Sequence, residues 1–265
     1  MRTLDARHVG TNMTTRLTLT RPNGTPITCW QGWTRPKKEV QWAPERSAME
    51  LAQAWFRQSK PAPPEELSQL LHSSERLADL QLLCGIPERV TSLPERGEGR
   101  NHDLWLLGRT RREQVTICIE AKADESFGND TIAEYRQSAM KRRESGIATR
   151  VPERIASLLS RVPREDSQWD NVRYQLLAAI CGTAIQAQRD GSALAVFVVH
   201  EFHTRKTSID KINANAEDLA VFMATITGSH RSIVPGMLYG PVTVDGMSCF
   251  IGKTVTYGNN RTAER

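Results

Sequence analysis

Residues 115–122 read Val-Thr-Ile-Cys-Ile-Glu-Ala-Lys, and this stretch decides the predicted fold. Side chains alternate between the two faces of a β-strand, so residues two positions apart point the same way. The odd-numbered positions are all apolar, whereas Glu120 and Lys122 share the other face. The pattern therefore predicts a strand of a core sheet that presents an acid and a base side by side.

A second strand is predicted at residues 103–107, joined to the first through a turn around Arg111 and Arg112. Antiparallel pairing across this turn sets Asp103 opposite Glu120. Directly opposed Cβ atoms lie roughly 4.5–5.5 Å apart. Two carboxylates at that separation repel each other unless a positive group lies between them.

A divalent cation is one group that would relieve this repulsion. Mg²⁺ prefers one or two carboxylates together with water and phosphate oxygens. Lys122 follows Glu120 by two positions, so its ammonium reaches the same place. A metal ion, two acids and an ammonium suit the attack of water on a phosphodiester. The alternative is a solvated cross-strand ion pair, because an acid and a lysine two positions apart on a strand are common.

Strand and helix patterns alternate along the rest of the chain, which is typical of the α/β class. Residues 169–188 show the clearest helical stripe, and residues 193–200 form an apolar strand of the kind that is buried on both faces. The other predicted elements are a hairpin at 14–33 with a turn at Asn23-Gly24 and a returning strand at 27–30, helices at 47–58, 65–83, 131–145, 153–162 and 217–226, a strand at 90–93, and a C-terminal hairpin through Asp245-Gly246. The predicted parts are an N-terminal appendage (1–60), a core (61–205) with a basic helical insertion (129–167), and a C-terminal helix and hairpin (206–265).

At the acidic residues the chain resembles the PD-(D/E)XK phosphodiesterase superfamily, which has the restriction-endonuclease-like fold. The superfamily motif is an Asp, a spacer, and then Asp/Glu-x-Lys on the next strand. Here it reads His102-Asp103, sixteen residues, and Glu120-Ala121-Lys122. The family order of helix, three-stranded meander, helix and strand fits the predicted elements of the core.

This resemblance implies a restriction-endonuclease-like core, with a mixed central sheet flanked by helices. It also implies that Asp103 and Glu120 hold Mg²⁺ or Mn²⁺ and that Lys122 orients the attacking water. His102 stands where the family usually has Pro, and the insertion at 129–167 is long. Neither departure removes a catalytic group, and together they leave the identity of the substrate undecided.

The superfamily often adds an acid upstream of the Asp, and Glu88 and Glu75 are the two candidates here. We prefer Glu88 as a third metal ligand because it lies just before the first predicted strand. Gln175, with Tyr174 beside it, resembles a Gln/Tyr pair that some members place next to the acids. The alternative for each of these residues is an ordinary packing or capping role on a helix.

Basic residues cluster in the insertion, where a phosphate-contacting surface and a solvated helix face are the two interpretations. The predicted nucleic-acid contacts are Arg136, Lys141, Arg142, Arg143 and Arg154. A second stretch at 30–42 combines Trp and Lys, which could stack on bases or pack in a core.

The composition fits this picture without requiring it. The chain has 265 residues with 35 Lys and Arg against 30 Asp and Glu, a net charge of +5 that is compatible with a nucleic-acid partner. The longest apolar run, 193–199, is too short to span a bilayer. Five cysteines without a CxxC pair indicate reduced thiols. We therefore expect a cytoplasmic protein without a membrane partner.

Taken together, the sequence predicts Mg²⁺-dependent (or Mn²⁺-dependent) hydrolysis of nucleic acid, with DNA as the favoured partner. The alternative is a non-catalytic module on the same fold that binds nucleic acid or protein, since fold alone does not fix function. The sequence does not decide the oligomeric state, and a homodimer is one of the states that we consider.

Overall fold

The computed structural model describes residues 17–93, 97–229 and 232–258. Seven strands form one mixed sheet in the order β1-β2-β3-β4-β5-β7-β6. The strands are β1 (Thr18–Leu19), β2 (Gln81–Thr91), β3 (Arg100–Arg109), β4 (Gln114–Lys122), β5 (Leu194–His203), β6 (Leu238–Val244) and β7 (Met247–Tyr257). The α-helices are α1 (Ser47–Trp55), α2 (Glu65–His72), α3 (Ile132–Glu144), α4 (Val151–Leu159), α5 (Tyr174–Asp190) and α6 (Ile209–Thr227).

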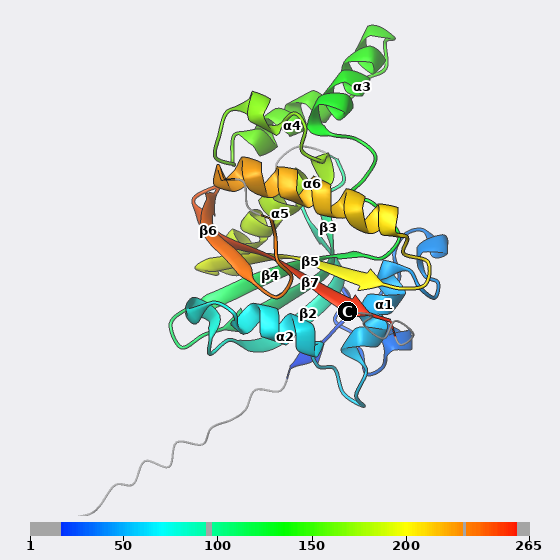
Figure 1. Cartoon of the computed structure of the whole chain (residues 1–265), viewed down its shortest axis with the longest axis vertical. Coiled ribbons are helices and arrows are strands. Elements are labelled where there is room, and N and C mark those ends of the chain that lie inside the picture. Colours follow the sequence, from blue (N-terminus) through cyan, green and yellow to red (C-terminus); the bar gives the residue numbers. More distant parts are fainter. Residues whose placement is uncertain (1–16, 94–96, 230–231, 259–265) are drawn as a thin grey trace, which may run out of the picture.

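Helices cover both faces of this sheet, so the predicted α/β class with a mixed central sheet is confirmed (Figure 1). The antiparallel meander β2-β3-β4 is followed by α3, α4 and α5, and then by β5, which lies parallel to β4. Apolar side chains of α4, α5 and α6 pack on one face, and those of α1 and α2 pack on the other. β4 is buried on both faces from Val115 to Lys122, and its odd-numbered side chains join the second of these clusters.

Residues 17–60 contribute to the same core. Trp33 and Trp55 are fully buried in the apolar cluster that also holds Leu67 of α2 and Ile117 of β4. Arg46 makes a two-pronged ion pair with Asp124, at 2.8 and 2.7 Å. α1 is thus attached to the loop that follows β4.

The predicted helix at 65–83 is too long. α2 ends at His72, a short 3₁₀ turn covers Glu75–Leu77, and β2 begins at Gln81. Gly85 does not stop a helix; a Cβ there would lie 2.6 Å from the Leu106 side chain, so glycine allows β2 to approach β3. Pro87 lies beyond the short β1 pairing, where β2 has a neighbour on one side, and sheets tolerate proline at such positions.

The predicted N-terminal strand at 27–30 is also wrong. One bridge between Thr20 and Pro26 closes the turn, and a 3₁₀ turn begins at Trp30. Residues 14–16 of the predicted hairpin lie outside the described residues. At the other end of the chain the predicted hairpin is present, but β7 pairs with β5, so this hairpin is the far edge of the central sheet.

The strand predicted at 90–93 is the end of β2, which begins nine residues earlier at Gln81. The other boundaries shift by a few residues, except at α6, which begins eight residues before the predicted helix 217–226. The helix predicted at 169–188 begins at Tyr174 because Asp166–Trp169 form a 3₁₀ turn, and Gly191 ends it in a left-handed conformation (φ 68°). No helix in the described ranges is both long and apolar enough to cross a membrane.

Candidate active site

Three carboxylates lie along neighbouring strands where the meander opens. The pairs Pro87–Leu104 and Arg89–His102 bracket Glu88 and Asp103 on β2 and β3. β3 and β4 pair in the predicted register, and Leu104–Ile119 is the last residue pair before the site. The backbones part beyond it, at Asp103 and Glu120.

Asp103 fills the gap between the parting strands with its side chain. Its Oδ2 accepts a hydrogen bond of 2.6 Å from the backbone N–H of Ala121. Burial raises the pKa of Asp103, while the nearby ammonium of Lys122 acts in the opposite direction. The carboxylate therefore has a structural contact on one oxygen and lies in a poorly solvated place.

Glu120 is buried (3% exposed) and is surrounded by donors. Its Oε1 accepts from Lys122 Nζ at 2.6 Å and from Gln175 Nε2 at 2.5 Å. Its Oε2 accepts from the Arg100 guanidinium. Arg100 and Lys122 thus supply positive charge to Glu120 from within the chain.

Lys122 is buried beside these acids. Burial lowers the pKa of Lys122 to about 8, although the Asp103 and Glu125 carboxylates act to raise it. Its Nζ lies 5.4 Å from the centre of the Phe127 ring. A lysine whose pKa is close to neutral can both hold and release a proton, as general acid–base chemistry requires.

Glu88, rather than Glu75, is the upstream acid that lies with Asp103. Its backbone is in the left-handed region (φ 54°), and its carboxylate accepts a hydrogen bond of 2.5 Å from Asn101 Nδ2. Burial and the charge of Asp103 raise the pKa of Glu88 to about 7. Glu75 lies in the 3₁₀ turn before β2, at the opposite end of that strand.

These groups line a cavity of about 300 Å³. Its lining is Pro36, Lys37, Lys38, Gln41, Ser47, Ala48, Glu88, Glu98, Arg100, Asn101, Asp103, Glu120 and Gln175. Lys37 and Glu98 form an ion pair of 2.9 Å at the rim. The loop after Lys122 is held nearby, because Glu125 accepts from the backbone N–H groups of Ala123 and Asp124 at 2.9 Å and from the Ser47 hydroxyl.

Arg100 and Asn101 were missed by the sequence analysis. Arg100 stands three residues before Asp103 on the same strand, and no spacing rule marks it. Asn101 donates to Glu88, and its own Oδ1 is buried without a hydrogen-bond partner in the described residues. These two residues complete the polar lining around the acids.

The predicted basic surface separates into two parts. Arg136, Lys141, Arg142 and Arg143 lie on α3, which projects from the body of the molecule (Figure 1). Arg143 is engaged with Glu153 at 2.5 Å and Arg136 with Asp170 at 3.4 Å. Arg154 on α4 instead hydrogen-bonds Tyr174, next to Gln175 of the site.

A divalent cation fits this site only in part. No group of three or more His, Cys, Asp or Glu within the described ranges is arranged to hold a metal. The donors are nevertheless all oxygens, which hard cations prefer. The orphaned Oδ1 of Asn101 and the mutually repelling carboxylates of Glu88 and Asp103 are groups that a cation would satisfy. Glu120 could join them if its internal cations moved.

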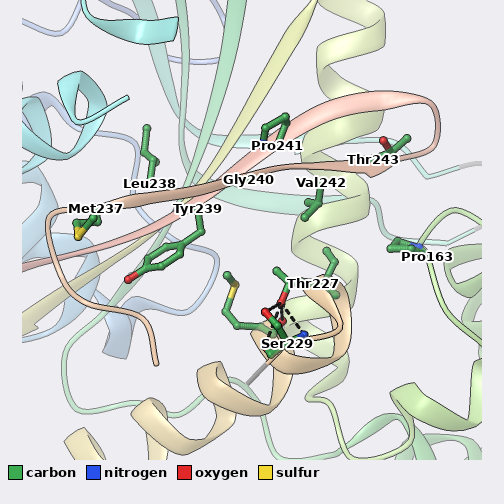
Figure 2. A pocket seen from close by; sticks show the side chains of 12 residues that line it. Pro163, Thr227, Ser229, Met237, Leu238, Tyr239, Gly240, Pro241, Val242 and Thr243 are labelled. Atoms are coloured by element: carbon green, nitrogen blue, oxygen red, sulfur yellow. Dashed lines mark hydrogen bonds between the residues drawn. The ribbon is translucent and has the colours of Figure 1, made fainter. Parts of the chain in front are cut away.

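A second hollow of about 580 Å³ lies between the end of α6 and β6 (Figure 2). Thr227 and Ser229 hydrogen-bond to each other at its floor, while Met237, Tyr239 and Val242 line it from the strand side. Its lining includes none of the predicted site residues, so we assign the chemistry to the acidic cavity.

The fold and the cavity define an α/β protein with an acid-and-lysine site between two parting strands. The chain belongs to the family described as "Domain of unknown function (DUF6946)", whose model matches residues 25–257. No curated protein and no solved structure matches the chain.

Proposed function

We propose that this protein is a Mg²⁺- or Mn²⁺-dependent phosphodiesterase that hydrolyses nucleic acid, with DNA as the substrate. The observation that carries this proposal is the gathering of Asp103, Glu120 and Gln175 in one cavity, with Lys122 bonded to Glu120. The three residues of the superfamily motif thus lie together with Gln175, which a separate resemblance had placed beside the acids.

The topology supports the same proposal. If the inserted helices α3 and α4 are set aside, the order is a helix, an antiparallel meander, a second helix and a strand parallel to the last strand of the meander: α2, β2-β3-β4, α5 and β5. This is the order that the restriction-endonuclease-like fold has. We therefore propose that fold for the core of the chain.

Each residue of the site has a distinct role in the proposed reaction. Asp103 and Glu120, with Glu88, would hold the metal ion, which when bound supplies a Lewis acid for the phosphate and activates water. Gln175 fixes the Glu120 carboxylate through its 2.5 Å hydrogen bond. Lys122 orients the water and holds or releases a proton at Nζ, for which a pKa of about 8 is suitable.

Positive groups lie where a nucleic acid would approach. Lys37 and Lys38 line the rim of the cavity, and α3 carries Lys141 and Arg142 on its exposed last turns. Lysine and arginine bind the nucleic-acid backbone largely through its phosphates, which makes binding sensitive to salt. We propose that the substrate runs from the rim toward α3.

Cleavage of plasmid and single-stranded oligonucleotides in Mg²⁺ or Mn²⁺ tests the proposal. We expect cleavage by the wild-type protein that EDTA abolishes, and loss of cleavage in Lys122→Ala and Glu120→Gln. Asp79→Ala removes an exposed acid that pairs with Arg111 at 3.6 Å, and this matched control should cleave normally. Cleavage that persists in both site variants would refute the assignment.

One observation favours a second candidate, a non-catalytic module that binds nucleic acid. Both oxygens of Glu120 accept hydrogen bonds from side chains of the same chain, as expected of a site that does not bind a metal ion. Such a module would bind oligonucleotides with the same affinity in Mg²⁺ and in EDTA, and it would not cleave them.

A further inference from the structure

Arg100 is the charged residue of the cavity that the proposed reaction leaves without a role. It begins β3, and its side chain is 12% exposed. Its guanidinium bonds Glu120 Oε2, and its buried Nε–H has no hydrogen-bond partner among the described residues. The guanidinium thus has donor capacity that the folded chain leaves unsatisfied.

The helix behind the site makes room for this side chain. Gly182 of α5 faces Arg100, and a Cβ at that position would lie 2.8 Å from Arg100 Cγ and 2.9 Å from its Cβ. Glycine in a helix interior is less favourable than alanine by about 1 kcal/mol. The close contact explains why Gly182 suits this helix position.

The charges around the cavity indicate what Arg100 does there. Away from the rim, Glu88, Asp103 and Glu120 supply three carboxylates, and Arg100 and Lys122 supply two cations. A divalent cation added to this set would make the site positive overall. One of the two cations would then have to leave Glu120. Each reaches Glu120 through one nitrogen, but Arg100 lines the cavity and Lys122 does not, so Arg100 is the side chain that can move aside into the cavity.

We propose that Arg100 is a resident cation of the site: it occupies Glu120 in the metal-free protein, gives way to the divalent ion, and then binds the phosphate of the substrate. This proposal rests on the proposed function. A guanidinium suits the second role because its planar set of donors matches a phosphate, and Lys122 is left at Glu120 to hold the proton.

Calorimetric titration of MnCl₂ into the full chain tests the competition directly. Arg100→Gln should bind Mn²⁺ about tenfold more tightly than the wild-type protein, because the competing charge is gone. Arg76→Gln removes an equivalent charge from a two-pronged pair with Glu113, at 2.7 and 2.9 Å, and should bind Mn²⁺ like the wild type. In Ca²⁺, Arg100→Gln should bind an oligonucleotide about tenfold more weakly than the wild type. The oligonucleotide affinity of Arg100→Lys should lie between those of Arg100→Gln and the wild type.

Gly182→Ala provides a second route that keeps the guanidinium. The added methyl group must displace Arg100 from its present position, since both clashing atoms lie near the backbone. The helix itself gains from the substitution. We expect tighter Mn²⁺ binding here as well, so the proposal can be judged even if Arg100→Gln does not fold.

The outcomes separate this proposal from the proposed function. Unchanged or weaker Mn²⁺ binding in folded Arg100→Gln and Gly182→Ala would overturn the resident-cation role while leaving the metal site intact. Mn²⁺ binding by neither the wild type nor Arg100→Gln would overturn both. Tighter Mn²⁺ binding with an unchanged oligonucleotide affinity would refute the phosphate-binding step.

Discussion

Replacing Glu88 by Gln should stabilise the metal-free protein at pH 8 and leave its stability almost unchanged at pH 4.5. Burial and the neighbouring Asp103 charge raise the pKa of Glu88 from 4.5 to about 7. The folded protein therefore holds a proton that the unfolded chain releases between these two values. Stability must fall as the pH rises through this window, because the unfolded state binds fewer protons there.

The size of the effect follows from the pKa shift. A rise from 4.5 to about 7 corresponds to about 3 kcal/mol of unfolding free energy once Glu88 is ionised. Glu88 is partly exposed, and screening by solvent reduces this figure, so we expect a difference of about 2 kcal/mol in unfolding free energy. Gln keeps an oxygen for the Asn101 amide, which preserves the 2.5 Å hydrogen bond.

Urea denaturation between pH 4.5 and pH 8, with EDTA present, measures this difference. The difference in unfolding free energy between Glu88→Gln and the wild type should increase as the pH rises. Mn²⁺ at pH 8 should reduce this difference because it stabilises the wild type. Glu75→Gln, which replaces an acid in the turn before β2, is the matched control and should show no such difference. Parallel pH profiles for Glu88→Gln and the wild type would show that burial and the Asp103 charge do not raise the pKa of Glu88 in the folded protein.

Three further predictions concern other parts of the molecule. Asp103→Ala should lose about 1 to 3 kcal/mol of stability because it leaves the Ala121 N–H without its acceptor, whereas Asp103→Asn keeps an oxygen there and should lose little; thermal unfolding in EDTA compares the two. Burial lowers the pKa of His200 to about 3, so below pH 6.5 the unfolded state binds a proton that the folded state does not bind. This residue should therefore cost the wild type up to about 1.4 kcal/mol of unfolding free energy per pH unit on acidification. In urea denaturation, the unfolding free energy of His200→Phe should fall less steeply as the pH is lowered. Replacing Arg142 and Arg143 by Ala should weaken DNA binding and reduce the slope of log affinity against log salt by about two, and fluorescence anisotropy across salt concentrations that gives an unchanged slope would make α3 a solvated helix.

Much of the fold can be predicted from the local periodicity of the sequence. The register that ends at Leu104–Ile119 follows from a short turn and from the alternation of β4, and both features are visible in the sequence. β5 was predicted for a similar reason, because a strand buried on both faces is a continuous apolar run. The position of Glu120 next to Lys122 on one face needed no tertiary information.

The extent of β2 and the place of Arg100 in the site could not be predicted, because both depend on contacts between residues that are distant in the sequence. Gly85 and Pro87 read locally as stops, and their place in β2 is explained by the nearby Leu106 side chain and by the short extent of β1. Arg100 reaches Glu120 from a diagonal position on the neighbouring strand, past a glycine more than eighty residues away in the chain. No local pattern encodes such a contact.

The attachment of α1 to the loop after β4 bears on how the chain could be divided. Arg46 and Ser47 hold Asp124 and Glu125, while Trp55 is buried in the shared core. The exposed residues 57–60 follow directly, and a cut there would leave every one of these contacts across the two pieces. We expect the nicked protein to remain a complex and two separately made fragments to reconstitute it. Neither fragment alone should keep the loop after β4 in place.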